Sequence, residues 1–260
     1  MGHSYGSRTS SDALDFLAEE LHQITRATEN VNPADFGISK FTISIGATPT
    51  ASAAIHLLKD PAAGAKVKEA IAAASKTHHL ELHAGVYPVL DMQQLSTHSR
   101  GYSTDDIGIR ILAEVLSVYD TSARDTPEAL IGAGSLALGR EPCQSYPGWG
   151  VLAPSPWKAK TTSTSTSTSI DEKEEKHRTI YTEQSKTGWI VKRISQEHGI
   201  LAWEGEISKM YPLDVGEKVL VWPNHACIAG PNFWGYFVVD SEREGRETEI
   251  VDVWCRARGW

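Results

Sequence analysis

At 260 residues, the chain has the length of one large domain or of two smaller ones. Its net charge of -8, with no cluster of lysine and arginine, disfavours binding to nucleic acid or to an anionic membrane surface, and no apolar run reaches the roughly 18 residues that a membrane span requires. Because Cys143, Cys227 and Cys255 are widely spaced and odd in number, a disulfide framework is not expected, and the sequence favours a cytoplasmic protein.

The first part of the chain predicts alternating helices and strands. Residues 10–30 begin with Ser and Asp capping candidates and then carry Leu14, Leu17 and Leu21 at helical spacing, which indicates an amphipathic helix. The next predicted elements are a strand, two helices and a second strand, over residues 40–50, 51–60, 63–76 and 79–91. This order is typical of an α/β layer or barrel.

After about residue 105 the pattern changes to short β-like runs between turns, which favours an antiparallel β-domain over residues 105–260. The run at 107–120 also fits a helix, but its Ile, Val and Tyr content and the turn that follows favour a strand. Within this part, the Thr/Ser repeat and charge run at 154–179 predict a disordered surface insertion. The predicted β-runs cover residues 107–120, 128–139, 188–196, 199–205, 217–223, 235–240 and 248–260.

The first part is short for a complete barrel. A full (β/α)₈ barrel takes about 250 residues, and less than half that length precedes the β-runs. The chain also opens with the loop-like stretch GHSYGSR without a predicted strand before it. Either the first part is a small open α/β layer, or the chain begins in the middle of a barrel.

His225 and Cys227 stand two residues apart after the apolar run at 217–223. If this stretch is extended, positions i and i+2 face the same side, so the imidazole and the thiol can converge on one ion. A thiolate with an imidazole suits zinc, and two protein ligands leave positions open for substrate. The same residues also fit a half-buried cysteine and a hydrogen-bonded histidine near a proline turn.

Two glycine-containing turns follow the predicted strands of the first part. Gly46 and Gly85 allow close approach of a ligand to the backbone, and Thr48 and Thr50 offer hydroxyl groups. A helix beginning near Thr50 offers amide donors to a dianion. These features fit a phosphate site, but the residues by themselves favour an ordinary strand-to-helix turn at GATPT.

Several stretches occur in the order found in one family: GHSYGS, SIGATPTAS, LHAGVYPVLDMQQ, SQEHGIL, VWPNHAC and VDVWCRARGW. In this order the chain resembles the eukaryotic D-serine dehydratases, which are relatives of the metal-dependent D-threonine aldolases and, more distantly, of alanine racemase (pyridoxal-phosphate fold type III). The stretch REPCQSYPGWG and the Thr/Ser insertion are similar to the fungal branch.

The resemblance implies a fold of two parts, α/β followed by all-β. Residues 1–104 would be the C-terminal, cofactor-binding part of a (β/α) barrel, and residues 105–260 an antiparallel β-domain with a metal site. In the family, a Schiff-base lysine lies on an early barrel strand, and that segment has no counterpart here. The resemblance therefore implies a truncated form without this lysine.

The resemblance also implies a site for pyridoxal 5'-phosphate in the first part. Its phosphate would be held by the loops around Gly46 and Gly85, and Tyr5 would lie against the cofactor. The implied cofactor-binding residues are Tyr5, Thr48, Thr50, Gly85, Val86 and Tyr87.

In the β-domain, the resemblance implies Zn²⁺ bound by His225 and Cys227, where it would act on the β-hydroxyl of the substrate as a Lewis acid. It puts His198, in the stretch QEHG, near the substrate or in support of the metal; a surface turn with a capping Glu197 fits the same stretch. Asp91, after the second predicted strand, could orient a neighbouring donor.

The implied reaction is α,β-elimination of a small-molecule D-amino acid, D-serine, to pyruvate and ammonia, in a homodimer. Two alternatives remain: a non-catalytic zinc-binding or interaction module derived from the family, and a half-barrel completed by a separate chain that supplies the lysine. Elimination and the retro-aldol cleavage of the sister aldolases also stay open. Cys227 favours the dehydratase, because the aldolases have a similar site in which an oxygen ligand takes the place of the cysteine.

Overall fold

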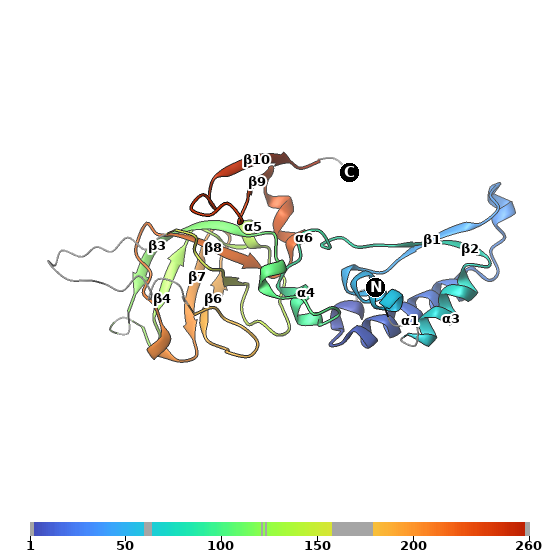
Figure 1. Ribbon diagram of the computed structural model, residues 1–260, viewed down its shortest axis with the longest axis horizontal. Helices are drawn as coiled ribbons and strands as arrows, with labels where there is room; N and C mark the ends of the chain where they lie inside the picture. Colours follow the sequence, from blue (N-terminus) through green and yellow to red (C-terminus); the bar gives the residue numbers. More distant parts are fainter. Residues whose placement is uncertain (1–2, 60–63, 121, 123, 158–178, 258–260) are drawn as a thin grey trace. The chain divides into compact units, whose positions relative to one another are not determined.

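The computed structural model describes residues 3–59, 64–120, 122, 124–157 and 179–257. The chain forms two compact units, Met1–Gly108 and Ile109–Trp260 (Figure 1). The predicted insertion at 154–179 lies almost entirely outside the described residues. No helix in the described ranges is long and apolar enough to cross a membrane.

The first unit contains the predicted α/β elements. As predicted, an amphipathic helix covers Ser10–Thr28, and the side chain of Thr9 caps it by accepting a hydrogen bond from the amide of Asp12. The predicted strands pair in parallel, which confirms the α/β order. The elements are α1 (Ser10–Thr28), β1 (Phe41–Ile45), α2 (Thr48–Lys59), α3 (Ala65–Ala74), β2 (His78–Leu82) and α4 (Met92–Thr97).

The helices of this unit cover one face of the β1–β2 sheet. Leu17 and Leu21 of α1 pack in one buried cluster with Ile43 and Ile45 of β1. Burial of this stripe removes apolar surface from water, at about 25 cal/mol per Å². The alternate positions are polar: Ser44 donates a hydrogen bond from Oγ to Oε2 of Glu81 at 3.1 Å. The strands therefore present an apolar face to the helices and a polar face on the opposite side.

The second unit is a closed antiparallel barrel with the strand order β3-β4-β7-β6-β5-β8. β8 closes the barrel because Val221 is paired with Ile111 of β3 on one side and with Leu152 of β5 on the other. Closure leaves no free sheet edge between these strands. The strands are β3 (Ile111–Tyr119), β4 (Glu128–Ile131), β5 (Gly150–Leu152), β6 (Gly188–Ile194), β7 (Gly199–Glu204) and β8 (Lys218–Pro223).

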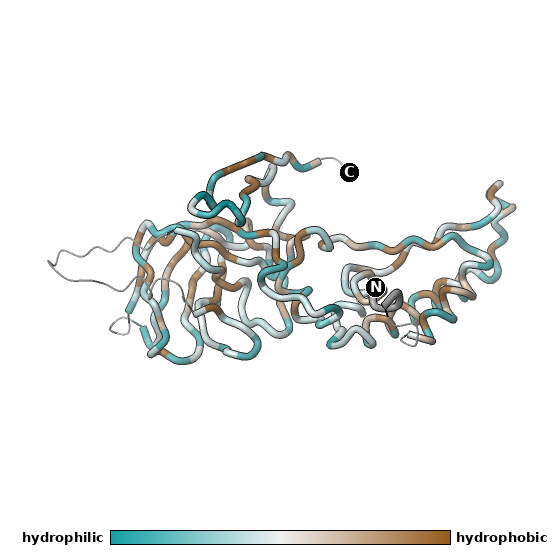
Figure 2. Tube along the Cα trace, viewed as in Figure 1, coloured by the Kyte–Doolittle hydropathy of each residue, from teal (hydrophilic) through white to brown (hydrophobic). Residues whose placement is uncertain are grey.

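The barrel interior is apolar because the strands alternate inward and outward residues. In β3, residues 111, 113 and 115 are buried and residues 112, 114 and 116 are exposed, so the strand interpretation of 107–120 is confirmed. Val115, Ile131, Val191 and Leu201 are fully buried inside. Figure 2 shows both hydrophobic and hydrophilic residues along the chain of this unit.

One predicted β-run is shorter in the structure, and two others form strands outside the barrel. The run at 128–139 ends as strand β4 at Ile131, and a short helix, α5 (Ser135–Leu138), follows it. The runs at 235–240 and 248–260 form a separate antiparallel hairpin of β9 (Gly235–Val239) and β10 (Ile250–Cys255). Between β8 and β9 lies α6 (Ala226–Ala229), which no part of the sequence analysis predicted.

Candidate functional site

His225 and Cys227 lie on a tight turn at the end of β8. The strand ends at Pro223, His225 has extended backbone angles as the residue before α6, and Cys227 lies within that helix. The premise of an extended stretch through Cys227 was therefore wrong. The stretch is not extended because the chain turns at Asn224. The Nδ2 atom of Asn224 donates hydrogen bonds to the carbonyl oxygens of Glu141 and Gly148, at 3.0 and 2.9 Å.

The imidazole of His225 is largely enclosed. Its side chain is 17% exposed, and Nδ1 lies 4.0 Å from Oε2 of Glu141. Burial lowers the pKa of His225, because the charged form loses its hydration, and the nearby Glu141 opposes this shift. The neutral imidazole, which is the form that binds metals, is thus favoured in the folded protein.

Cys227 is exposed and forms no disulfide. A thiol and a neutral imidazole are donors that suit a borderline-soft ion such as zinc. Within the part of the chain that the structure describes, no group of three or more His, Cys, Asp or Glu side chains is placed to hold a metal ion. The ligation of zinc by His225 and Cys227 stays a prediction.

The turn after β1 leads into α2 earlier than predicted, since the helix begins at Thr48. Gly46 has φ of +91°, and a Cβ atom there would lie 2.8 Å from Oγ1 of Thr50. Thr50 Oγ1 accepts a hydrogen bond from the amide of Ala47 at 2.9 Å. The turn thus needs glycine. The amides of Thr48 and Thr50 in the first turn of α2 have no acceptor within the helix, which suits an anion, whereas Pro49 between them has no amide hydrogen.

The loop after β2 is joined to this turn through one hydrogen bond. The amide of Val86, which the resemblance assigned to a phosphate, donates to Oγ1 of Thr48 at 3.1 Å, and both residues are buried. Neighbouring Gly85 and Tyr87 are exposed. The structure therefore brings Thr48, Thr50 and Val86 together, with the Thr48 hydroxyl as the partner of the Val86 amide.

Arg100 is a residue near this loop that the sequence analysis missed. Its guanidinium carbon lies 5.5 Å from the ring centroid of Tyr102, and interactions with Tyr102, followed by Tyr87, raise the pKa of Arg100. Tyr102 in turn has its hydroxyl 2.9 Å from Oγ of Ser52 in α2. No motif in the sequence signals this arrangement. Tyr5, the predicted cofactor neighbour, is half-buried in a 3-10 turn, His3–Gly6, and Asp91 caps α4 by accepting from the amide of Gln94 at 2.9 Å.

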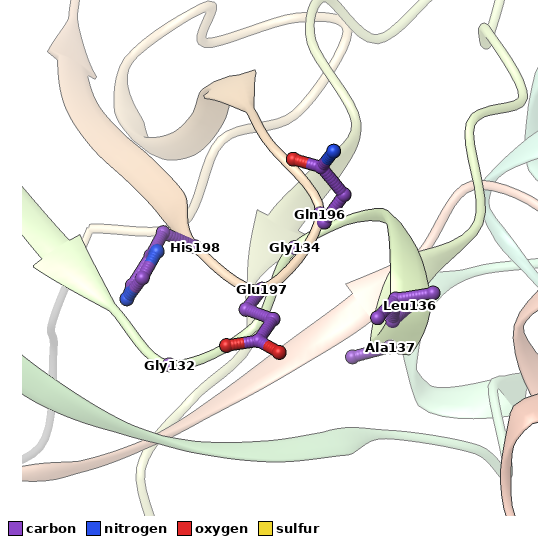
Figure 3. A pocket seen from close by; sticks show the side chains of 7 residues that line it. All are labelled: Gly132, Gly134, Leu136, Ala137, Gln196, Glu197 and His198. Carbon is purple, nitrogen blue, oxygen red and sulfur yellow. The ribbon is translucent and has the colours of Figure 1, made fainter.

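His198 lies at the rim of the barrel, beside an open hollow of about 360 Å³. Figure 3 shows Glu197 and His198 on the turn between β6 and β7, with side chains that diverge. The turn is held because the amides of Ser135 and Leu136 donate to the carbonyls of Ser195 and Gln196, both at 2.9 Å. A substrate role for His198 stays a prediction.

The sequence and the fold were compared with known proteins. The serine dehydratase domain family model matches residues 108–239, about half of the chain. Among curated proteins, the D-serine dehydratase of Saccharomyces cerevisiae is 33% identical over 262 residues, which cover 100% of this chain and 52% of that enzyme. The chain spans about half the length of the curated relatives it matches.

Among solved structures, an alanine racemase-like protein from Idiomarina loihiensis has a TM-score of 0.62 at 21% identity, covering 100% of this chain and 54% of that one. D-threo-3-hydroxyaspartate dehydratase from Delftia sp. HT23 has a TM-score of 0.60 at 23% identity, covering 100% and 55%. Solved variants of that dehydratase replace a histidine and, two positions later, a cysteine by alanine; the cysteine variant is in the metal-free form. The likeness confirms the predicted fold class.

Proposed function

Since this chain belongs to the serine dehydratase domain family, we propose that it is part of a lyase that converts D-serine to pyruvate and ammonia. In this reaction the α-proton and the β-hydroxyl leave, and hydrolysis then releases ammonia. The observation that carries the proposal is the position of His225 and Cys227 on one turn at the end of β8, within the family-matched residues.

His225 and Cys227 hold a zinc ion in this proposal. The burial that lowers the pKa of His225 keeps its imidazole ready to bind, and the exposed thiol of Cys227 is accessible to the ion. Zinc at this turn supplies Lewis acidity to the departing β-hydroxyl. The spacing of the histidine and cysteine replaced in the solved dehydratase variants, one of them metal-free, supports this pair.

The first unit contributes the cofactor phosphate site. The turn at Gly46 and the first amides of α2 bind and orient the phosphate, and the Thr48 hydroxyl holds the second loop in place through the amide of Val86. Pyridoxal 5'-phosphate, when bound, supplies an acceptor for the electron pair left by the α-proton. The substrate class is a small β-hydroxy D-amino acid.

Zinc content tests the proposal directly. The chain is purified as wild type and as His225→Ala, Cys227→Ala and Cys255→Ala, and zinc is measured by elemental analysis. Cys255 is also exposed and outside any disulfide, so its variant is a matched control for loss of a surface thiol. We expect stoichiometric zinc in the wild type and the control and none in the other two. A folded wild-type chain that holds no zinc would overturn the proposal.

A further inference from the structure

Glu141 lies beside the imidazole of His225, although His225 comes 84 positions after it in the sequence. Oε2 of Glu141 is 4.0 Å from Nδ1 of His225, and the Glu141 side chain is 43% exposed. The Nδ1 atom itself is buried. An Nδ1–H directed at Glu141 puts the lone pair of the neutral imidazole on Nε2, which is then the nitrogen that would bind an ion.

Two separate contacts hold the Glu141 segment against this turn. The first is the hydrogen bond from Nδ2 of Asn224, itself buried, to the carbonyl oxygen of Glu141 at 3.0 Å. The second is the packing of Gly139, whose Cβ position lies 2.5 Å from Cγ2 of Ile228 in α6. Because Asn224 precedes His225 and Ile228 follows Cys227, both contacts hold the backbone of the Glu141 segment next to the turn that carries the proposed ligands.

We propose that Glu141 is a positioning residue for the metal site, whose carboxylate accepts the Nδ1–H of His225 and so presents Nε2 to zinc. This inference rests on the proposed function of the His225–Cys227 pair. A hydrogen bond needs a closer approach than 4.0 Å, by about 1 Å, which rotation of the half-exposed Glu141 side chain can supply. A metal-bound histidine is commonly oriented by a carboxylate on its other ring nitrogen, and loss of such a partner weakens metal binding about 10- to 100-fold.

The experiment measures the Zn²⁺ affinity of the full chain by competition with a chromophoric chelator. The variants are Glu141→Ala, Glu141→Gln and, as a control, Glu244→Ala, which removes an exposed carboxylate from the β9–β10 turn of the same unit. We expect Glu141→Ala to raise the Kd about 10- to 100-fold, Glu141→Gln, which keeps the side-chain length and an acceptor oxygen, to recover part of the affinity, and Glu244→Ala to match the wild type. At saturating Co²⁺, Glu141→Ala should keep the absorption band of the thiolate–metal bond, because its ligands are unchanged.

The outcomes separate this inference from the proposed function. If the wild type binds no Zn²⁺, the function proposed for the pair fails. If the wild type binds Zn²⁺ and His225→Ala does not, but Glu141→Ala binds as tightly as the wild type, the positioning role of Glu141 fails alone. If Glu141→Ala also lowers the Tm of the zinc-free chain, the Zn²⁺ affinity of Glu141→Gln decides. An affinity as weak as that of the alanine variant would overturn the role of Glu141 as the acceptor of Nδ1–H.

Discussion

Gly139 packs so closely on Ile228 that a Cβ atom at Gly139 would lie 2.5 Å from Cγ2 of the isoleucine. Gly139 ends α5 with φ of +73°, and Ile228 lies in α6, next to Cys227. The contact joins the segment of Glu141 to the helix of the proposed metal ligands, so its integrity decides the local geometry of the site.

Replacement of Gly139 by alanine should therefore destabilise the barrel unit for two reasons. The backbone of Gly139, with φ of +73° and ψ of -170°, lies in a region essentially restricted to glycine, which costs another residue about 1–3 kcal/mol, and the added methyl group overlaps Ile228. Gly245 also has a positive φ, +73°, but nothing within 4 Å of its Cβ position, so Gly245→Ala carries a backbone cost without the overlap. Urea unfolding should show a larger loss of unfolding free energy for Gly139→Ala than for Gly245→Ala. Adding Ile228→Ala to Gly139→Ala should recover only the part of the lost stability that comes from the steric overlap. Equal losses of stability in Gly139→Ala and Gly245→Ala would contradict the packing argument.

Tyr146 and Tyr181 should be the last tyrosines to ionise. Both are buried, with ring centroids 6.2 Å apart. Burial raises the pKa of Tyr146, and the charges of Glu183 and Cys143 raise it further. Burial is also the main cause of the raised pKa of Tyr181, and the charge of Glu204 is the second cause. Because unfolded tyrosine ionises near pH ~10, the unfolded chain loses protons first, and the free energy of unfolding should fall as the pH rises above that value.

The measurement is an alkaline titration followed by tyrosinate absorbance, beside urea unfolding at each pH. In the wild type, part of the absorbance change should coincide with unfolding, whereas Tyr146→Phe should reduce that part and weaken the pH dependence of stability. Complete ionisation of all 8 tyrosines in the folded chain would contradict the prediction.

Thr48→Val should destabilise the first unit. Valine keeps the shape of threonine but removes the Oγ1 acceptor of the Val86 amide, which then stays buried without its partner. Such a loss costs about 1–3 kcal/mol. Thr48→Ser keeps the hydroxyl and is the matched control. Thermal unfolding and hydrogen exchange at the Val86 amide measure the effect; equal exchange rates in the two variants would show that the hydroxyl does not hold the loop.

Local patterns in the sequence predicted most of the elements. Leu14, Leu17 and Leu21 recur at helical spacing, and that spacing by itself defines the buried stripe of α1. The Ile, Val and Tyr content of residues 107–120 and the turn after them likewise indicated a strand, which the structure has as β3. These predictions succeeded because helical spacing and residue content need no knowledge of distant residues.

The predictions for the site were less complete because its contacts are distant in sequence. Nothing near His225 announces that Asn224 bonds to Glu141 and turns the chain into α6, so the extended conformation was the natural but wrong expectation. Arg100 with Tyr87 and Tyr102 escaped notice for the same reason, since no spacing rule relates these side chains.

The sequence by itself determined the α/β and β parts, the family resemblance and the candidate residues, because composition, periodicity and ordered motifs are local properties of the chain. Only the tertiary structure decided that the β-part closes into a barrel, that Glu141 faces Nδ1 of His225, and that the Thr48 hydroxyl takes the Val86 amide. Each of these depends on which buried polar groups find one another when the chain packs, and that pairing is set by the whole fold.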